Sequence, residues 1–210
     1  MHFRSSVFSI PRTVVCLVVL VVLGAGFAPH NAGADAKPVM LVPQKPLAVT
    51  LESLEQTRAV QKHMVQLIEK LHPCVVGVNK SGGVIVSEDG YVLSAGHTAS
   101  RCKNNVATVI MPDGKRYKAD LLGVDVYNDV GLVKIRDEGP FPFVKMFNSE
   151  QIAQDEWCVT MGYPAGYKQG QPAAAQVCRF VRIDKDDELR TDARLAGGYS
   201  GGPLFDSHGR

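Results

Sequence analysis

The chain has 210 residues, which is enough for one or two small domains, and 45% of them are hydrophobic, as in an ordinary globular protein. The formal net charge of +2 comes from Arg4 and Arg12, because basic and acidic residues balance from Asp35 onward. A balanced chain with no basic run lacks the electrostatic footprint of nucleic-acid binding, so we expect no nucleic acid as a partner.

The N-terminus, residues 1–34, has the pattern of a secretory signal peptide. Arg4 and Arg12 form a positive region before an almost wholly apolar run at 13–28, and Ala32 and Ala34 supply the small residues needed for cleavage before Asp35. The sequence therefore predicts export to the periplasm or the extracellular space. The apolar run is short for a bilayer span of about 20 residues, and an uncleaved membrane anchor is the alternative.

A linker and one helix are expected over residues 35–72. The linker at 35–50 is rich in Pro, Ala and Lys. Ser53 and Gln56 have capping-box spacing at the start of the helix, and His72-Pro73 stops it, because a residue before proline disfavours the helical region. The apolar residues of this segment form one stripe with helical period: Val60, Met64, Leu67, Ile68 and Leu71. His63 lies on the same helix, and we expect it at the surface.

From Cys74 the pattern changes to short apolar runs separated by turns, which predicts an antiparallel barrel over 73–140. Asp89-Gly90 between two apolar runs is a strong hairpin signal, and the second strand of that hairpin leads into His97. The strands expected in this domain are 75–78, 83–86, 91–94, 106–111, 116–124 and 130–135.

The pattern repeats over 141–210, after a connection rich in Gly and Pro. The strands expected there are 157–162, 176–183 and 189–193, with a Gly/Pro-rich loop at 163–172 and a charged, solvated turn at 184–188. We read this second half as another β-domain.

Export changes how the cysteines are interpreted. Four remain when Cys16 of the leader is set aside, and an even number in an oxidising compartment suggests disulfides with three possible connectivities. Cys158 and Cys178 lie on successive expected strands and are the favoured pair, which leaves Cys74 with Cys102. Buried free thiols are the alternative. No pair has the close spacing of a zinc site, and no metal is expected.

Ser200 stands in a glycine-rich run, Gly197-Gly-Tyr-Ser-Gly-Gly-Pro-Leu204. Glycines permit backbone conformations that a Cβ forbids, so a reacting carbonyl can approach closely and the N–H groups of Gly198 and Ser200 can point at one oxyanion. The alternative is a plain tight turn.

These segments together resemble the chymotrypsin-fold serine proteases, in the form of the HtrA/Deg branch. The resemblance runs from about His72 to Leu204 with the motifs in family order: 85–97, 128–135, 157–166, 191–193 and 197–204. It implies an all-β fold of two antiparallel Greek-key barrels, preceded by the signal peptide and one helix. It also implies strands beyond Arg210 that close the second barrel, which we therefore expect to be incomplete.

The resemblance gives roles to residues whose chemistry fits them. Serine needs a nearby base, and the base needs an orienting group, so Ser200 is the expected nucleophile, His97 the general base and then acid, and Asp129 the group that orients the imidazole. Asp125 competes with Asp129, which is preferred because it directly precedes the apolar strand. Leu195 stands where the branch places an apolar substrate-pocket residue, which hints at an aliphatic P1 side chain.

The resemblance thus implies a serine endopeptidase that acts on exported polypeptides, unfolded or damaged, without metal or cofactor. Trimerisation follows only by analogy with the branch. Two departures stand out: Tyr199 replaces the usual Asp or Asn before the nucleophile, and Ala196-Gly197 replaces Asn-Pro. Tyr199, together with the strands expected beyond Arg210, motivates the alternative of an inactive homologue that binds peptides or a protein partner.

Overall fold

The computed structural model describes residues 51, 53–183 and 189–210. The predicted signal peptide at 1–34, the linker at 35–50 and the charged turn at 184–188 lie outside the described residues. No helix in the described ranges combines the length and the hydropathy needed to cross a bilayer.

The predicted N-terminal helix is confirmed as α2, Leu54–Leu71. The Ser53 hydroxyl accepts a hydrogen bond from the Gln56 N–H at 3.1 Å, which satisfies one of the free donors of the first turn. The chain then passes through a short 3-10 helix, η2, His72–Cys74, with Pro73 in its first turn. The helix ends where the sequence predicts because proline cannot continue it.

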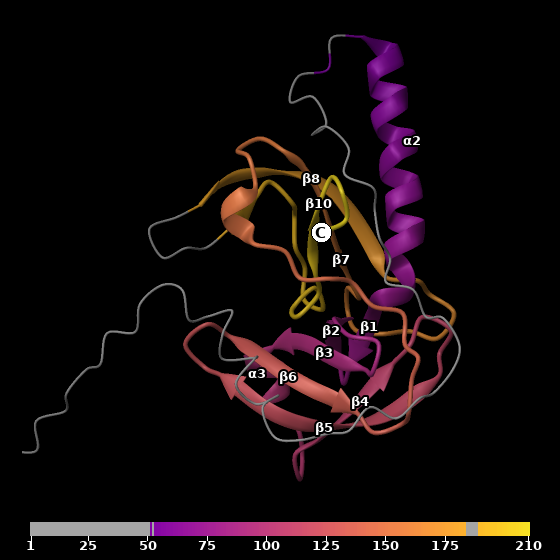
Figure 1. Ribbon diagram of the computed structural model, residues 1–210, viewed down its shortest axis with the longest axis vertical. Helices are drawn as coiled ribbons and strands as arrows, with labels where there is room; N and C mark the ends of the chain where they lie inside the picture. Colours follow the sequence, from indigo (N-terminus) through magenta and orange to yellow (C-terminus); the bar gives the residue numbers. More distant parts are fainter. Residues whose placement is uncertain (1–50, 52, 184–188) are drawn as a thin grey trace, which may run out of the picture. The chain divides into compact units, whose positions relative to one another are not determined.

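The first β-domain is a closed antiparallel barrel (Figure 1). Its strand order is β1-β2-β3-β6-β5-β4, and β1 pairs with β4 to close it. The strands are β1 Val75–Val78, β2 Ser81–Ile85, β3 Tyr91–Ala95, β4 Val106–Ile110, β5 Arg116–Asp125 and β6 Val130–Ile135. The pairing of β3 with β6, across two intervening strands in the chain, gives the barrel its Greek-key connection.

Alternating side chains fill the barrel. Every second residue of β6 is buried, beginning with Gly131, and β4 shows the same alternation as far as Val109. Phe141, from the connection after β6, packs into this core, with only 4% of its surface exposed. The predicted boundary at 140/141 stays a prediction, and Phe141 packs with the strands that precede it.

The second β-domain is an open four-stranded sheet in the order β10-β7-β8-β9. Its strands are β7 Trp157–Gly162, β8 Ala174–Ile183, β9 Leu189–Thr191 and β10 Leu204–Asp206, and a 3-10 helix, η3, Ser149–Gln151, precedes them. The expectation of an incomplete second barrel is confirmed. The sequence did not predict β10, because only three residues separate Pro203 from the turn that follows.

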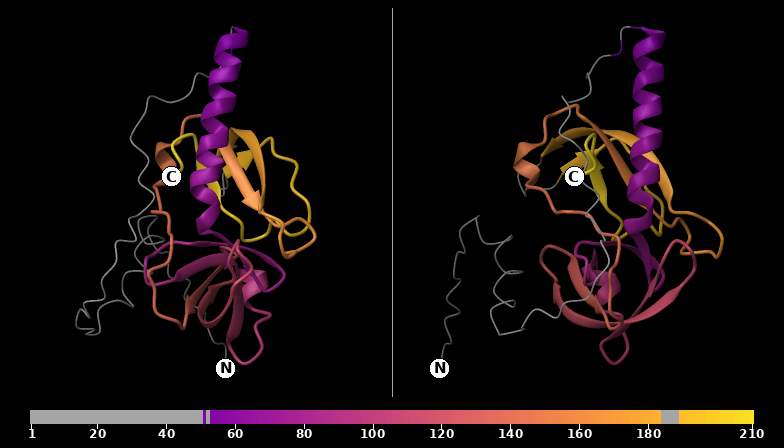
Figure 2. Two further views of the ribbon diagram at one scale, coloured as in Figure 1. Left: turned by 90° about the vertical axis from the view of Figure 1, so that its right-hand side faces the viewer. Right: turned by 45° about the vertical axis from the view of Figure 1, so that its right-hand side comes forward.

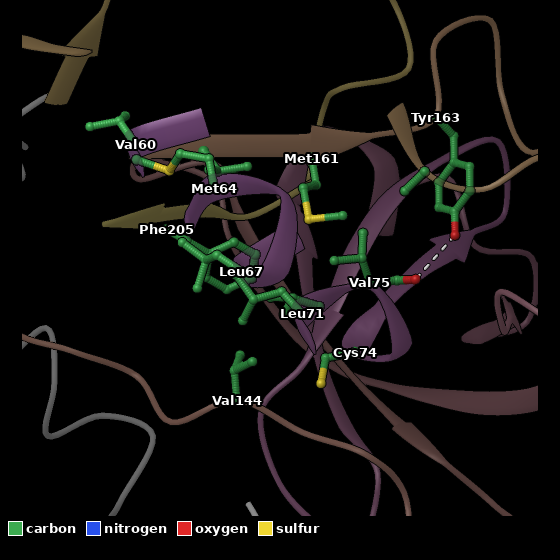
Figure 3. Packing of buried hydrophobic residues seen from close by; sticks show 13 residues of the cluster. Val60, Met64, Leu67, Leu71, Cys74, Val75, Val144, Met161, Tyr163 and Phe205 are labelled. Carbon is green, nitrogen blue, oxygen red and sulfur yellow. Dashed lines mark hydrogen bonds between the residues drawn. The ribbon is translucent and has the colours of Figure 1, made fainter. Parts of the chain in front are cut away.

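Helix α2 lies beside the second sheet (Figures 1 and 2). Figure 3 shows its stripe meeting Met161 of β7 and Phe205 of β10 in one cluster. The buried members of the stripe are Val60, Met64, Leu67 and Leu71. Tyr163 extends this cluster to the barrel, because its hydroxyl donates a hydrogen bond to the Val75 carbonyl at 3.0 Å. The first strand and the second sheet are thus connected through the buried core.

Candidate active site

His97 lies in a one-turn helix that follows β3, α3, Gly96–Ala99. The Gly96 N–H donates to the Asp129 carbonyl oxygen at 2.7 Å, and a Cβ at Gly96 would come within 3.0 Å of the Asp129 backbone. Glycine at this position therefore lets the two segments approach closely. The sequence predicted the strand but not the helical turn, because four residues are too few to show a helical period.

Asp129 contacts His97 at two points. Its Oδ1 accepts the His97 backbone N–H at 2.7 Å, and its Oδ2 lies 2.8 Å from the imidazole Nδ1. The hydrogen bond from the His97 side chain is the main cause that lowers the pKa of the Asp129 carboxyl, and the backbone N–H groups add to it. The carboxylate is therefore ionised near neutral pH and fixes the orientation of the ring.

Asp125, the alternative candidate for orienting the imidazole, instead forms hydrogen bonds within its own turn. Its carboxylate accepts hydrogen bonds from the backbone N–H groups of Tyr127 and Asn128 and from the Asn128 side chain. These bonds lower the pKa of the Asp125 carboxyl and shape the turn between β5 and β6. In that turn Asp129 adopts φ +52°, a left-handed conformation that aspartate tolerates better than most residues.

The loop that carries Ser200 is held against the end of β7. Gly198 has φ +107°, and a Cβ there would meet the Tyr163 carbonyl oxygen at 2.0 Å. The Tyr163 N–H donates to the Gly198 carbonyl, and the Ala165 N–H donates to the Gly197 carbonyl at 2.8 Å. Only glycine fits at 198, so this part of the run is required by close backbone approach.

A second contact joins the Ser200 loop to the barrel. The Ser200 carbonyl oxygen accepts the Gly82 N–H of β2 at 2.9 Å, and the Ser94 hydroxyl of β3 donates to the Gly82 carbonyl at 2.7 Å. Ser200, His97 and Asp129 then line the same open cleft of about 390 Å³. The three catalytic residues predicted from the sequence thus line one cleft, although they are far apart along the chain.

The expected oxyanion donors are free to bind a ligand. Among the described residues, neither the Gly198 N–H nor the Ser200 N–H donates a hydrogen bond. The side chain of Tyr199, between them, is turned inward and only 8% exposed. It packs on Gly162, where an added Cβ would come within 2.9 Å of the Tyr199 Cα. The absence of a side chain at 162 therefore makes room for the bulky residue.

Two other residues that the sequence singled out, Leu195 and His63, do not line the cleft. Leu195 does not line the cleft and is 61% exposed, so its role as a substrate-pocket residue stays a prediction. His63 was expected at the surface rather than as a ligand, and its side chain is partly exposed. Its ring is partly buried, and Nε2 lies 2.8 Å from the Ser207 carbonyl oxygen. The sequence could not show this, because Ser207 is distant in the chain.

Sequence reasoning missed a buried polar cluster at the end of β10. Glu156, Asp206 and His208 are all buried and place one oxygen or nitrogen each within 4.8 Å of one another. Arg210 contacts Asp206 Oδ2 at 2.8 Å, and the Ser207 hydroxyl donates to Glu156 at 2.9 Å. The arginine thus places a positive charge against the buried Asp206 carboxylate.

Comparison with known proteins agrees with this geometry. The family model for the trypsin-like peptidase domain matches residues 81–210, which contain all of the candidate site residues. The chain belongs to the trypsin-like peptidase family.

Relatives of this trypsin-like peptidase chain point to the HtrA/Deg branch. The chain is 33% identical over 132 residues to a protein of Chlamydia trachomatis named "Probable periplasmic serine endoprotease DegP-like". The match covers 61% of this chain and 26% of that protein. A protein of the same name from Rhizobium meliloti is 32% identical over 133 residues. This match covers 62% of the present chain and 26% of the relative. The chain therefore spans about a quarter of the length of these relatives.

The fold of the trypsin-like peptidase chain also matches a solved structure. The crystal structure of the serine endoprotease from Yersinia pestis superposes with a TM-score of 0.61 and 25% sequence identity, covering 69% of this chain and 54% of that one. The predicted chymotrypsin-like fold is confirmed.

Proposed function

We propose that this protein is a serine endopeptidase. The observation that carries the proposal is the His97–Asp129 contact at 2.8 Å in a cleft that Ser200 also lines. Ser200 would attack a peptide carbonyl while His97 takes its proton, and His97 would then give that proton to the amine that leaves as the C–N bond breaks. Water would next attack the acyl-enzyme, with His97 taking its proton and returning it to the Ser200 oxygen as the acid product is released. The family membership and the names of the relatives support the same chemistry.

Asp129 would act through His97. Its carboxylate keeps Nδ1 as the donor, so that Nε2 is free to accept the serine proton, and it stabilises the imidazolium that forms. The Gly198 and Ser200 N–H groups, which have no acceptor among the described residues, would bind the oxyanion. Each such donor is worth about 3–4 kcal/mol in comparable sites.

The substrate class that we propose is exported polypeptide chain in unfolded or damaged form. The cleft is open rather than enclosed, which suits an extended backbone better than a small molecule. The relatives named as periplasmic endoproteases support export of this chain, with residues 1–34 as its cleaved signal. Homo-trimer formation stays a prediction by analogy.

A fluorophosphonate probe tests the nucleophile, because it reacts only with an activated serine. We expect labelling of the protein, loss of labelling in Ser200→Ala, and unchanged labelling in Ser149→Ala, whose serine is exposed and remote from the cleft. Labelling that persists in Ser200→Ala would overturn the assignment. A folded protein that is never labelled would favour the inactive, peptide-binding homologue.

A further inference from the structure

Two thiols face each other in the second sheet. Cys158 of β7 and Cys178 of β8 are directly opposite in the antiparallel register. Their sulfur atoms are 3.3 Å apart and share a hydrogen bond. Both side chains are buried, at 0% and 3% exposure, among the apolar residues of the sheet. Neither takes part in the chemistry proposed for Ser200.

The other two cysteines of the described chain have different surroundings. Cys74 packs in the cluster beneath α2, whereas Cys102 contacts the barrel core and accepts a hydrogen bond from the Asn79 side chain at 3.4 Å. All four cysteines are free thiols in this structure. Within the described residues, only Cys158 and Cys178 are recorded in sulfur–sulfur contact.

We propose that Cys158 and Cys178 form a disulfide in the exported protein. Residues directly opposite in an antiparallel sheet have Cα atoms about 4.5–5.5 Å apart, which lies inside the range of about 4.4–6.8 Å that disulfides span. The two sulfurs can therefore reach bonding distance by side-chain rotation, without movement of either strand. The inference does not depend on the proposed protease activity.

The bond forms by thiol–disulfide exchange with a small-molecule or protein disulfide as oxidant. One cysteine thiolate attacks the donor, makes a mixed disulfide and releases one donor thiolate. The second cysteine thiolate attacks the protein sulfur of the mixed disulfide and releases the second donor thiolate. The two cysteines lose two electrons and two protons in total, and the donor leaves as two thiols.

In the folded sheet, the pKa values of the two thiols shift in opposite directions. The hydrogen bond between the two thiols raises the pKa of Cys158 and lowers that of Cys178, which is further lowered by a hydrogen bond with Thr191. Because both sulfurs are buried in the folded sheet, the exchange takes place during folding, and the finished bond is protected from reductant.

The disulfide would stabilise the sheet that holds the nucleophile loop. Asp206 of β10 is the register partner of Cys158, so Asp206, Cys158 and Cys178 form one row across β10, β7 and β8. Ser200 lies just before β10 in the chain. A cross-link in this row reduces the conformational freedom of the unfolded chain and keeps the support of Ser200 folded.

Peptide mapping of the full-length protein, exported and alkylated without reduction, tests the proposal directly. Trypsin separates the two cysteines, because Lys145, Lys168 and Arg179 place them on peptides 146–168 and 169–179. We expect these two peptides to be joined, and to separate after reduction. The peptide that contains Cys74 should be recovered alkylated and serves as the internal control. Alkylation of both Cys158 and Cys178, or a link from either to another cysteine, would overturn the proposal.

Thermal unfolding gives a second measurement. Protein refolded with reductant should melt about 10 °C lower than oxidised protein, and the Cys158→Ala/Cys178→Ala variant should melt at one temperature in both conditions. Cys74→Ala removes a buried thiol outside the pair and should keep the full response to reductant. An unchanged melting temperature of the original protein after unfolding and refolding in reductant would contradict the proposal. The peptide map decides the question if the double variant does not fold.

Discussion

Asp129 holds both the backbone and the imidazole of His97, with one carboxylate oxygen on each. We predict that Asp129→Asn leaves the protein folded and lowers kcat by about 10⁴-fold, the loss seen for this change in a protease of the same fold. The amide cannot hold the imidazole in the required tautomer. Hydrolysis of an unfolded protein substrate measures the effect, with circular dichroism to confirm folding.

Asp125→Asn is the matched control for that experiment. Asp125 bonds only within its own turn, so the variant should keep activity within about tenfold of the original protein. An equal loss in both variants would show that the turn, and not the carboxylate of Asp129, limits the reaction.

Gly198→Ala should damage both stability and activity. Its φ of +107° is unfavourable for alanine, and the added Cβ would lie 2.0 Å from the Tyr163 carbonyl oxygen. We expect a loss of about 3 kcal/mol in the free energy of unfolding and about 10²-fold in kcat, because the loop must move one oxyanion donor. Urea unfolding and steady-state kinetics measure the two effects.

Gly197→Ala provides the control on the neighbouring residue. No atom lies within 4 Å of a Cβ built at Gly197. Its stability should change by less than about 0.5 kcal/mol. Similar losses at 197 and 198 would mean that the whole run is sensitive and that the contact with Tyr163 is not decisive.

The packing of α2 predicts a cavity effect. Leu67→Ala should lower the free energy of unfolding by about 2–5 kcal/mol, because Leu67 is 2% exposed in the cluster with Phe205. Val65→Ala, on the opposite face and 48% exposed, should change it by less than about 0.5 kcal/mol. Equal effects in a denaturant titration would show that the helix is not docked on the second sheet.

The environment of His72 predicts that the free energy of unfolding depends on pH. Burial lowers the pKa of its imidazole below 6.5, and Nε2 accepts the Ala173 N–H at 3.0 Å, so the folded protein holds the ring neutral. The unfolded chain binds the proton more tightly. The contribution of neutral His72 to the free energy of unfolding is therefore complete above the pKa that His72 has in the unfolded chain. It is lost as the pH falls towards the lower pKa that His72 has in the folded protein.

His72→Gln tests this relation. Glutamine can still accept the Ala173 N–H but does not titrate, so the variant should lose less stability than the original protein between about pH 8 and about pH 5. Denaturant unfolding at a series of pH values gives the comparison. Parallel curves would exclude His72 as the source.

The pattern of apolar runs and turns was sufficient to locate most strands, because alternation and Asp-Gly turns are local signals. The expected bounds of β6 and β7 agree with the structure to the residue. Contacts between distant segments could not be predicted in this way. The hydrogen bond of His63 with Ser207 and the burial of Glu156 beside Asp206 depend on the docking of α2 and on β10, which local periodicity does not report.

In the candidate site, too, the motifs could be predicted from the sequence, whereas contacts between distant segments could not. The resemblance selected His97, Asp129 and Ser200, and the structure places all three on one cleft. It could not say how Tyr199 is accommodated, because that depends on Gly162 of another strand.

The contact of α2 with Phe205 also has a consequence for the order in which the protein matures. Helix α2 is synthesised before every strand in the described ranges, but Phe205, one of its packing partners, is synthesised after both β-domains have begun. Until the strand with Phe205 arrives, the apolar side of α2 is exposed to other chains and to chaperones. The apolar side of α2 is therefore fully buried only after the segment with Ser200 and Phe205 has folded.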